Sequence, residues 1–83
     1  MLAKDLSANI KTFIDNALTL QKGSQGEMVL VLQKVLKKMG YFTATPDGIF
    51  GNITDASVKA YQKDVGLYAD GIFGPKSWTK LLG

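Results

Sequence analysis

Apolar residues recur along this chain at the steps of three and four that place side chains on one face of a helix. The first stripe covers residues 1–19 and predicts an N-terminal amphipathic helix. Two further stripes predict helices over residues 25–39 and, approximately, 52–65. A short last helix is expected over residues 75–82, because Pro75 stands at the first helical position, where proline is best tolerated.

Glycine and turn residues separate these stripes. Gly40 and Gly66 each follow the last periodic residue of a helix, where a left-handed C-cap favours glycine. Ser24 and Glu27 have the spacing of a capping box, which predicts that the second helix begins there. Residues 40–51 include a Pro-Asp-Gly turn that no helix crosses, so we expect an ordered loop.

The helical pattern predicts an all-α fold with one shared core. A chain of 83 residues buries only about 60 to 65% of its unfolded surface, which supports a single domain. Its 46% hydrophobic content is ordinary for a folded globular domain. The expected core residues occupy inward positions of the helices, and they are Leu32, Leu36, Val58, Tyr61, Val65 and Leu81.

Composition narrows the chemistry that the chain can perform. Histidine and cysteine are absent, which excludes Cys/His and Ser/His catalysis and removes the commonest zinc ligands. The net charge of +3 comes from lysines without any arginine, which argues against specific nucleic-acid recognition. Residues 1–20 offer neither an apolar signal core nor a membrane span. We therefore expect no metal site, cofactor, nucleic-acid partner, membrane anchor or export signal in this chain.

A pentapeptide, Asp-Gly-Ile-Phe-Gly, occurs twice, beginning at Asp47 and again at Asp70. A hydroxyl residue stands three positions after the last glycine of each copy, Thr54 in the first and Ser77 in the second. The preceding helices match as well, since each contains a glutamine and ends at a glycine. Helix, glycine, loop and turn therefore recur in the same order.

This repeat resembles the type 1 peptidoglycan-binding domain, which occurs beside cell-wall hydrolases and, in related form, in matrix metalloproteinase prodomains. The likeness covers about residues 20–83 and leaves residues 1–19 outside. It implies a three-helix orthogonal bundle with two Asp-Gly loops, noncovalent binding of peptidoglycan, and a hydrolase domain elsewhere in the parent protein. The resemblance rests on Leu20, Gly23, Gly26, Val29, Leu32, Gln33, Leu36, Gly40, Tyr41, Asp47, Gly48, Phe50, Gly51, Thr54, Val58, Tyr61, Gln62, Gly66, Leu67, Asp70, Gly71, Gly74, Ser77, Trp78 and Leu81.

The repeated polar residues have a structural and a functional interpretation. Asp47 and Asp70 precede glycines, where an aspartate side chain usually accepts local backbone amides. The alternative, a pair of glycosidase carboxylates, is disfavoured because the same motif twice argues for turn chemistry. Gln33 and Gln62 are expected to brace the loop backbone. We therefore predict no catalytic residues.

A ligand is expected where the loop at 41–50 meets the loop at 67–73, since two copies of one turn can form the walls of a groove. Tyr41 is the best single candidate for ligand contact, while Trp78 either packs or stacks on a sugar. One residue of each Ile-Phe pair should anchor its loop to the core. The predicted lining is Tyr41, Asp47, Phe50, Asn52, Asp70 and Phe73.

The leading hypothesis is a monomeric, noncatalytic module that binds a glycan strand or stem peptide of peptidoglycan, at the cell wall or otherwise outside the cell. Such a module targets an associated hydrolase to its polymeric substrate by raising the local concentration. One alternative is a protein-interaction or prodomain-like regulatory module without glycan binding. A cryptic carboxylate-based wall hydrolase is another.

Overall fold

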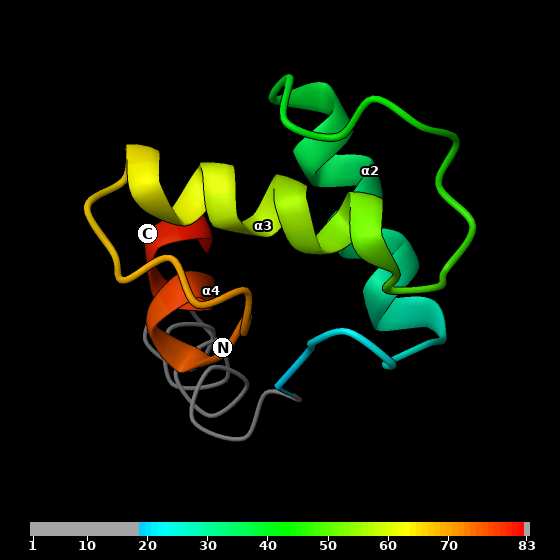
Figure 1. The fold of residues 1–83 in the computed structure, drawn as a ribbon, viewed down its shortest axis with the longest axis horizontal. Helices are drawn as coiled ribbons and strands as arrows, with labels where there is room; N and C mark the ends of the chain where they lie inside the picture. The colour runs from blue at the N-terminus through cyan, green and yellow to red at the C-terminus, as the bar shows by residue number, and fades with distance from the viewer. Residues whose placement is uncertain (1–18, 83) are drawn as a thin grey trace, which may run out of the picture.

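The computed structural model describes residues 19–82, and three helices lie within them. These are α2 (Glu27–Lys38), α3 (Asn52–Asp64) and α4 (Pro75–Leu82), each close to its predicted range. The helix expected over residues 1–19 falls, apart from its last residue, outside the described part. Figure 1 shows α3 lying between the loop that follows α2 and the loop that leads to α4. The all-α prediction is confirmed.

The helix α2 begins later than the capping-box pattern predicted. Gly26 is its N-cap residue, and no side chain caps the helix. The Ser24 hydroxyl instead accepts a hydrogen bond from the backbone N–H of Gln21 at 3.1 Å. The capping-box prediction was wrong because the backbone at Gly26, whose N–H is paired with the carbonyl of Gly48 at 2.9 Å, is not helical.

The two longer helices end in the same way, at the glycines that the sequence pointed to. Gly40 and Gly66 have φ values of 93° and 82°. The next residue, Tyr41 or Leu67, donates its N–H at 2.8 Å to the carbonyl five residues earlier. This is the Schellman arrangement, which satisfies a terminal helix carbonyl and turns the chain sharply.

The extended segment before α2 joins the two Asp-Gly loops. Leu20 and Phe73 exchange backbone hydrogen bonds of 3.0 and 2.7 Å. Further along, the N–H of Gly23 donates to Phe50, whose own N–H donates to the Ser24 carbonyl, both at 2.9 Å. Both copies of the pentapeptide are therefore fastened to one strand-like segment that the helical pattern did not predict.

One apolar core lies between the helices, and four of the six predicted core residues are fully buried within it. Val65 and Leu81 are partly buried and pack against it. Trp78 is buried and meets the ring of Phe73 edge to face, with centroids 4.8 Å apart, so its packing role is confirmed. Within the described residues no helix is both long and apolar enough to cross a membrane. The buried apolar residues are Leu20, Val29, Leu32, Leu36, Phe42, Phe50, Val58, Tyr61, Phe73 and Trp78.

Candidate functional site

The first Asp-Gly turn is organised by the buried side chain of Gln33. Its Oε1 accepts the N–H groups of Asp47 at 2.9 Å and Gly48 at 2.7 Å. Its Nε2 donates toward Asp47 Oδ1, the Ile49 carbonyl and Thr54 Oγ1, at 3.1, 3.0 and 2.9 Å. Asp47 Oδ1 also accepts the N–H of Ile49 at 2.9 Å. One amide from α2 thus holds the whole turn.

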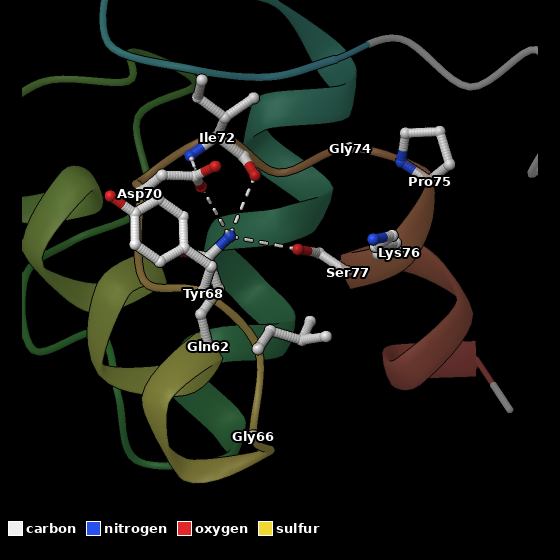
Figure 2. Close-up of a pocket in the computed structure, with 10 residues that line it drawn as sticks. Gln62, Gly66, Tyr68, Asp70, Ile72, Gly74, Pro75, Lys76 and Ser77 are labelled. Atoms are coloured by element: carbon white, nitrogen blue, oxygen red, sulfur yellow. Dashed lines mark hydrogen bonds between the residues drawn. The ribbon is translucent and has the colours of Figure 1, made fainter.

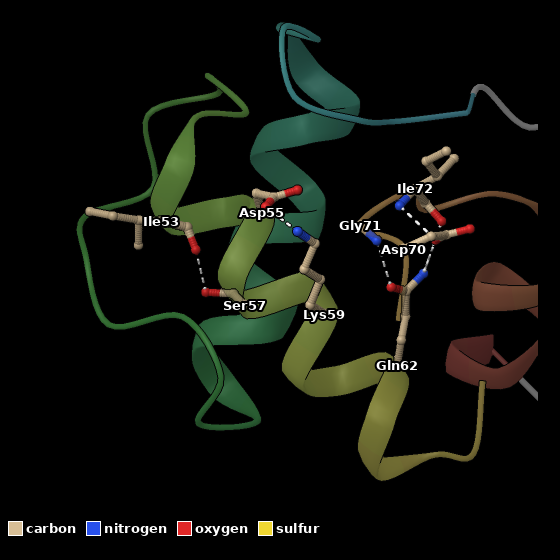
Figure 3. Close-up of polar contacts among 8 residues, drawn as sticks. All are labelled: Ile53, Asp55, Ser57, Lys59, Gln62, Asp70, Gly71 and Ile72. Atoms are coloured by element: carbon tan, nitrogen blue, oxygen red, sulfur yellow. Dashed lines mark hydrogen bonds and ion pairs between the residues drawn. The ribbon is translucent and has the colours of Figure 1, made fainter. Parts of the chain in front are cut away.

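The second turn repeats this network around Gln62 on α3. Its Oε1 accepts the N–H of Gly71 at 3.0 Å. Its Nε2 donates toward Asp70 Oδ1 at 3.3 Å, the Ile72 carbonyl at 2.9 Å and Ser77 Oγ at 3.2 Å (Figures 2 and 3). The N–H of Ile72 donates to Asp70 Oδ1 at 2.9 Å. The internal repeat is therefore a repeat of hydrogen bonds as well as of residues.

These networks confirm the structural interpretation of the repeated residues. Gln33 and Gln62 brace the loops, and Asp47 and Asp70 accept backbone amides within their turns. The Ile49 N–H, followed by the Gln33 amide, lowers the pKa of Asp47 below its usual value, because both stabilise the charged carboxylate.

The structure separates the two loops that were expected to form one groove. Each turn is fastened to its own glutamine, one on α2 and one on α3. In Figure 1, α3 lies between the loop that follows α2, which contains the first turn, and the loop that leads to α4, which contains the second. The hollows beside the loops are accordingly lined by one loop each.

Two members of the predicted lining need correction. Phe50 and Phe73 are only 1% and 0% exposed, so neither ring faces a groove. Both were misplaced because their rings belong to the apolar core, where that of Phe73 contacts Tyr61 and Trp78. The isoleucine that precedes each phenylalanine is exposed instead, at 56% for Ile49 and 41% for Ile72. One residue of each pair does anchor its loop, as predicted.

Tyr41 and Asn52 share a shallow hollow of about 330 Å³ beside the start of α3. The Tyr41 hydroxyl donates to Asp64 Oδ2 at 2.8 Å, and this hydrogen bond raises its pKa. The ring of Tyr41 meets that of Tyr61 edge to face, with centroids 5.6 Å apart. The Tyr41 ring is therefore held in place by Tyr61 and its hydroxyl is already bonded, while Asn52 is exposed.

A larger hollow of about 630 Å³ lies beside the second turn (Figure 2). Tyr68, 85% exposed, contributes an aromatic ring, and Ile72 and Pro75 add apolar surface. Asp70 and Lys76 stand on opposite sides of it. The sequence interpretation missed Tyr68 and Lys76, although comparing the two copies position by position would have shown where they differ.

Comparison with known proteins identifies the family to which the helices and the two glutamine-centred turns belong. Residues 25–81 match the family described as "Putative peptidoglycan binding domain". This chain belongs to that family. The match begins just before α2, contains both glutamine-centred turns and ends in α4, so the peptidoglycan-binding domain is the part of the chain whose geometry is described above.

Named relatives carry this peptidoglycan-binding domain within longer proteins. The chain is 36% identical over 74 residues to a spore cortex-lytic enzyme of Bacillus cereus. The aligned region covers 89% of this chain and 28% of that enzyme. It is 41% identical over 56 residues to the N-acetylmuramoyl-L-alanine amidase CwlM of Mycobacterium tuberculosis, covering 68% of this chain and 14% of that protein. The chain thus spans less than a third of either relative.

The fold of the peptidoglycan-binding domain also matches a solved structure. The SleB N-terminal domain superposes with a TM-score of 0.76 at 37% sequence identity. The superposition covers 78% of this chain and 89% of that domain. The three-helix fold that the repeat implied is therefore confirmed by a relative of known structure.

Proposed function

We propose that this domain binds peptidoglycan noncovalently, as a monomer, and holds an associated hydrolase against the cell wall. The observation that carries the proposal is the family match over residues 25–81, which includes both turns. The relatives named above are a spore cortex-lytic enzyme and an amidase, each much longer than this chain. A tethered binding domain raises the concentration of a catalytic domain at an insoluble substrate without any new chemistry.

The same proposal leaves bond cleavage to the associated hydrolase. Asp47 and Asp70, the carboxylates that a glycosidase interpretation would use, each have one oxygen engaged by a backbone N–H of their own turn. The chain contains no histidine or cysteine to act as a base or nucleophile. Because the repeated carboxylates already serve to shape the loops, the geometry supports a binding role for this domain better than a catalytic one.

Among the residues predicted to contact ligand, Tyr41 and Asn52 are the proposed contacts on the first-copy side. They share one open hollow, and an aromatic ring beside an exposed amide suits a carbohydrate or a peptide. Asp47 takes part chiefly by shaping the first loop, and Asp70 shapes the second loop through one of its two oxygens.

Co-sedimentation of the full chain with purified sacculi tests the proposal. We expect the protein to pellet with sacculi and to be displaced by an excess of solubilised peptidoglycan fragments. The supernatant, analysed by chromatography for released muropeptides, should match a protein-free control. A folded protein that stays in the supernatant would favour the protein-interaction alternative, and muropeptide release by the pure chain would show catalysis.

A further inference from the structure

The two turns share their framework and differ at their surfaces. Tyr68 and Phe42 each stand two residues after a helix-ending glycine, yet Tyr68 is 85% exposed and Phe42 only 4%. Lys76 and Ile53 each stand two residues after the last glycine of the pentapeptide. The second copy therefore has an exposed aromatic ring and a cation where the first has a buried ring and an aliphatic side chain.

These differences are not required by the turn. The first copy builds the same glutamine-centred network without a lysine or an exposed tyrosine at these positions. The shared residues Gln62, Asp70 and Ser77 account for the second network. An exposed tyrosine and a lysine therefore line a hollow of about 630 Å³ without taking part in the network that holds the turn.

The hollow of about 630 Å³ beside the second turn, called the second-loop hollow below, has one negative and one positive side chain on its rim. In Figure 2, Asp70 lies on one side, Lys76 on the other, and the ring of Tyr68 stands near Asp70. Asp70 Oδ1 is occupied by the turn, while its Oδ2 accepts no hydrogen bond from residues 19–82. Within the same residues the structure shows no ion pair for Lys76. A carboxylate and an ammonium group therefore face the hollow together.

We propose that the second-loop hollow binds the peptide stem of peptidoglycan rather than its glycan strand, an inference that rests on the proposed function. A stem peptide carries free carboxylates, the amine of a diamino acid, and methyl and methylene groups. Lys76 complements a carboxylate, Asp70 complements the ammonium group, and the ring of Tyr68 with Ile72 and Pro75 covers the apolar groups. The sugars of the strand are joined by glycosidic bonds and carry neutral hydroxyl and acetamido groups, so they offer no such pair of opposite charges.

The volume and openness of the site fit this ligand. Small-molecule sites usually enclose about 300 to 1,000 Å³, and the second-loop hollow lies within that range. Its charged residues are exposed, so the attraction is screened by salt and each contact is modest. The site therefore gives weak, salt-sensitive affinity per stem, which a polymer with many stems multiplies.

An NMR titration of the full chain tests the inference. The probes are a soluble stem tetrapeptide with L-alanine, D-glutamate, a diamino acid and D-alanine, and chitotetraose as the glycan. We expect the tetrapeptide to shift the amides of Tyr68, Ile72 and Lys76, and chitotetraose to leave them unshifted. Lys76→Gln and Tyr68→Ala should each weaken tetrapeptide binding about three- to fivefold.

Matched control variants test whether the effect of Lys76→Gln comes from its position in the second-loop hollow. One control removes the same charge elsewhere, and the other changes the equivalent position in the first copy of the repeat. Lys80→Gln removes the same charge one turn further along α4, and Ile53→Gln alters the equivalent position of the first copy. Both should bind the tetrapeptide as the wild type does. Asp70→Asn keeps an oxygen for the turn, and should weaken the free tetrapeptide but not one whose side-chain amine is acetylated.

The outcomes distinguish this inference from the proposed function. A wild type that co-sediments with sacculi but shows no tetrapeptide shifts at the second-loop hollow overturns the inference alone. Chitotetraose shifting the same amides, or unchanged affinity in folded Lys76→Gln and Tyr68→Ala, does so as well. Failure of the wild type to bind sacculi at all contradicts the proposed function itself.

Discussion

Gln62 donates a hydrogen bond to the backbone carbonyl of Ile72 at 2.9 Å, from a side chain that is only 2% exposed. This contact fixes the loop in front of α4, and Gln33 makes the same contact with Ile49 at 3.0 Å. A single buried amide therefore decides the path of each Asp-Gly loop. The positions of the exposed residues around the second-loop hollow depend on it.

Replacing Gln62 with leucine should destabilise the protein by at least about 2 kcal/mol, because it leaves buried backbone groups of the turn without partners. Urea denaturation followed by circular dichroism measures the change. Gln25→Leu, at an exposed position, is the control and should stay within about 0.5 kcal/mol of the wild type. Equal midpoints for the two variants would show that the network contributes little.

Leu36→Ala should cost about 2 to 5 kcal/mol, since the side chain is fully buried in the shared core and its removal leaves a cavity. Met39→Ala is a matched control in the residue that caps α2, where 49% of the side chain is exposed. Thermal and chemical denaturation should both separate these variants. An unchanged midpoint for Leu36→Ala would contradict the burial of this face of α2.

Gly71→Ala should be more harmful than Gly23→Ala, although both glycines have positive φ values of 79° and 102°. A Cβ at Gly71 would collide with the Asp55 carboxylate, whose ion pair with Lys59 measures 3.1 Å and is drawn in Figure 3. A Cβ at Gly23 would meet nothing within 4 Å.

The left-handed backbone alone costs about 1 to 2 kcal/mol in each glycine variant, so the collision appears as the difference between them. Unfolding free energies measured under identical conditions give that difference. A cost for Gly23→Ala equal to that of Gly71→Ala would indicate that the Asp55 and Lys59 side chains move aside without loss.

The lowered pKa of Asp47 predicts acid sensitivity. Because its pKa in the folded state lies below the unfolded value of about 3.9, the charged carboxylate stabilises the fold above that pH. This contribution is lost as the pH falls through the folded-state pKa. Asp47→Asn should therefore show a weaker decline in unfolding free energy on acidification, measured at several pH values below about 5. An identical decline would assign the acid sensitivity to other carboxylates.

Tyr41→Ala together with Asn52→Ala should weaken sacculus binding about ten- to thirtyfold, or roughly 1 to 2 kcal/mol, if the first-copy hollow contacts the polymer. Tyr41→Phe keeps the ring and removes only the hydrogen bond to Asp64, so it should bind almost normally. Circular dichroism confirms folding in each case. Full binding by a folded double variant would remove this hollow from the interface.

The candidate site was only partly predictable from the sequence. The glutamine and aspartate roles were correctly predicted, because buried amides and Asx turns act within one loop and its preceding helix. Phe50 and Phe73 were placed on the wrong side, since their burial depends on packing into a core shared with residues far along the chain. Tyr68 was overlooked because exposure at one position cannot be derived from helical periodicity.

The sequence by itself determined the three described helices, the glycine ends of the two longer ones, their buried faces and the recurrence of the turn. These features arise from spacing and local backbone preference, which act over a few neighbouring residues. The tertiary structure alone decided that Leu20 pairs with Phe73, that α3 lies between the two loops, and that a hollow opens between Asp70 and Lys76. Those relationships join segments far apart in the chain, and they follow from packing around one core rather than from any local pattern.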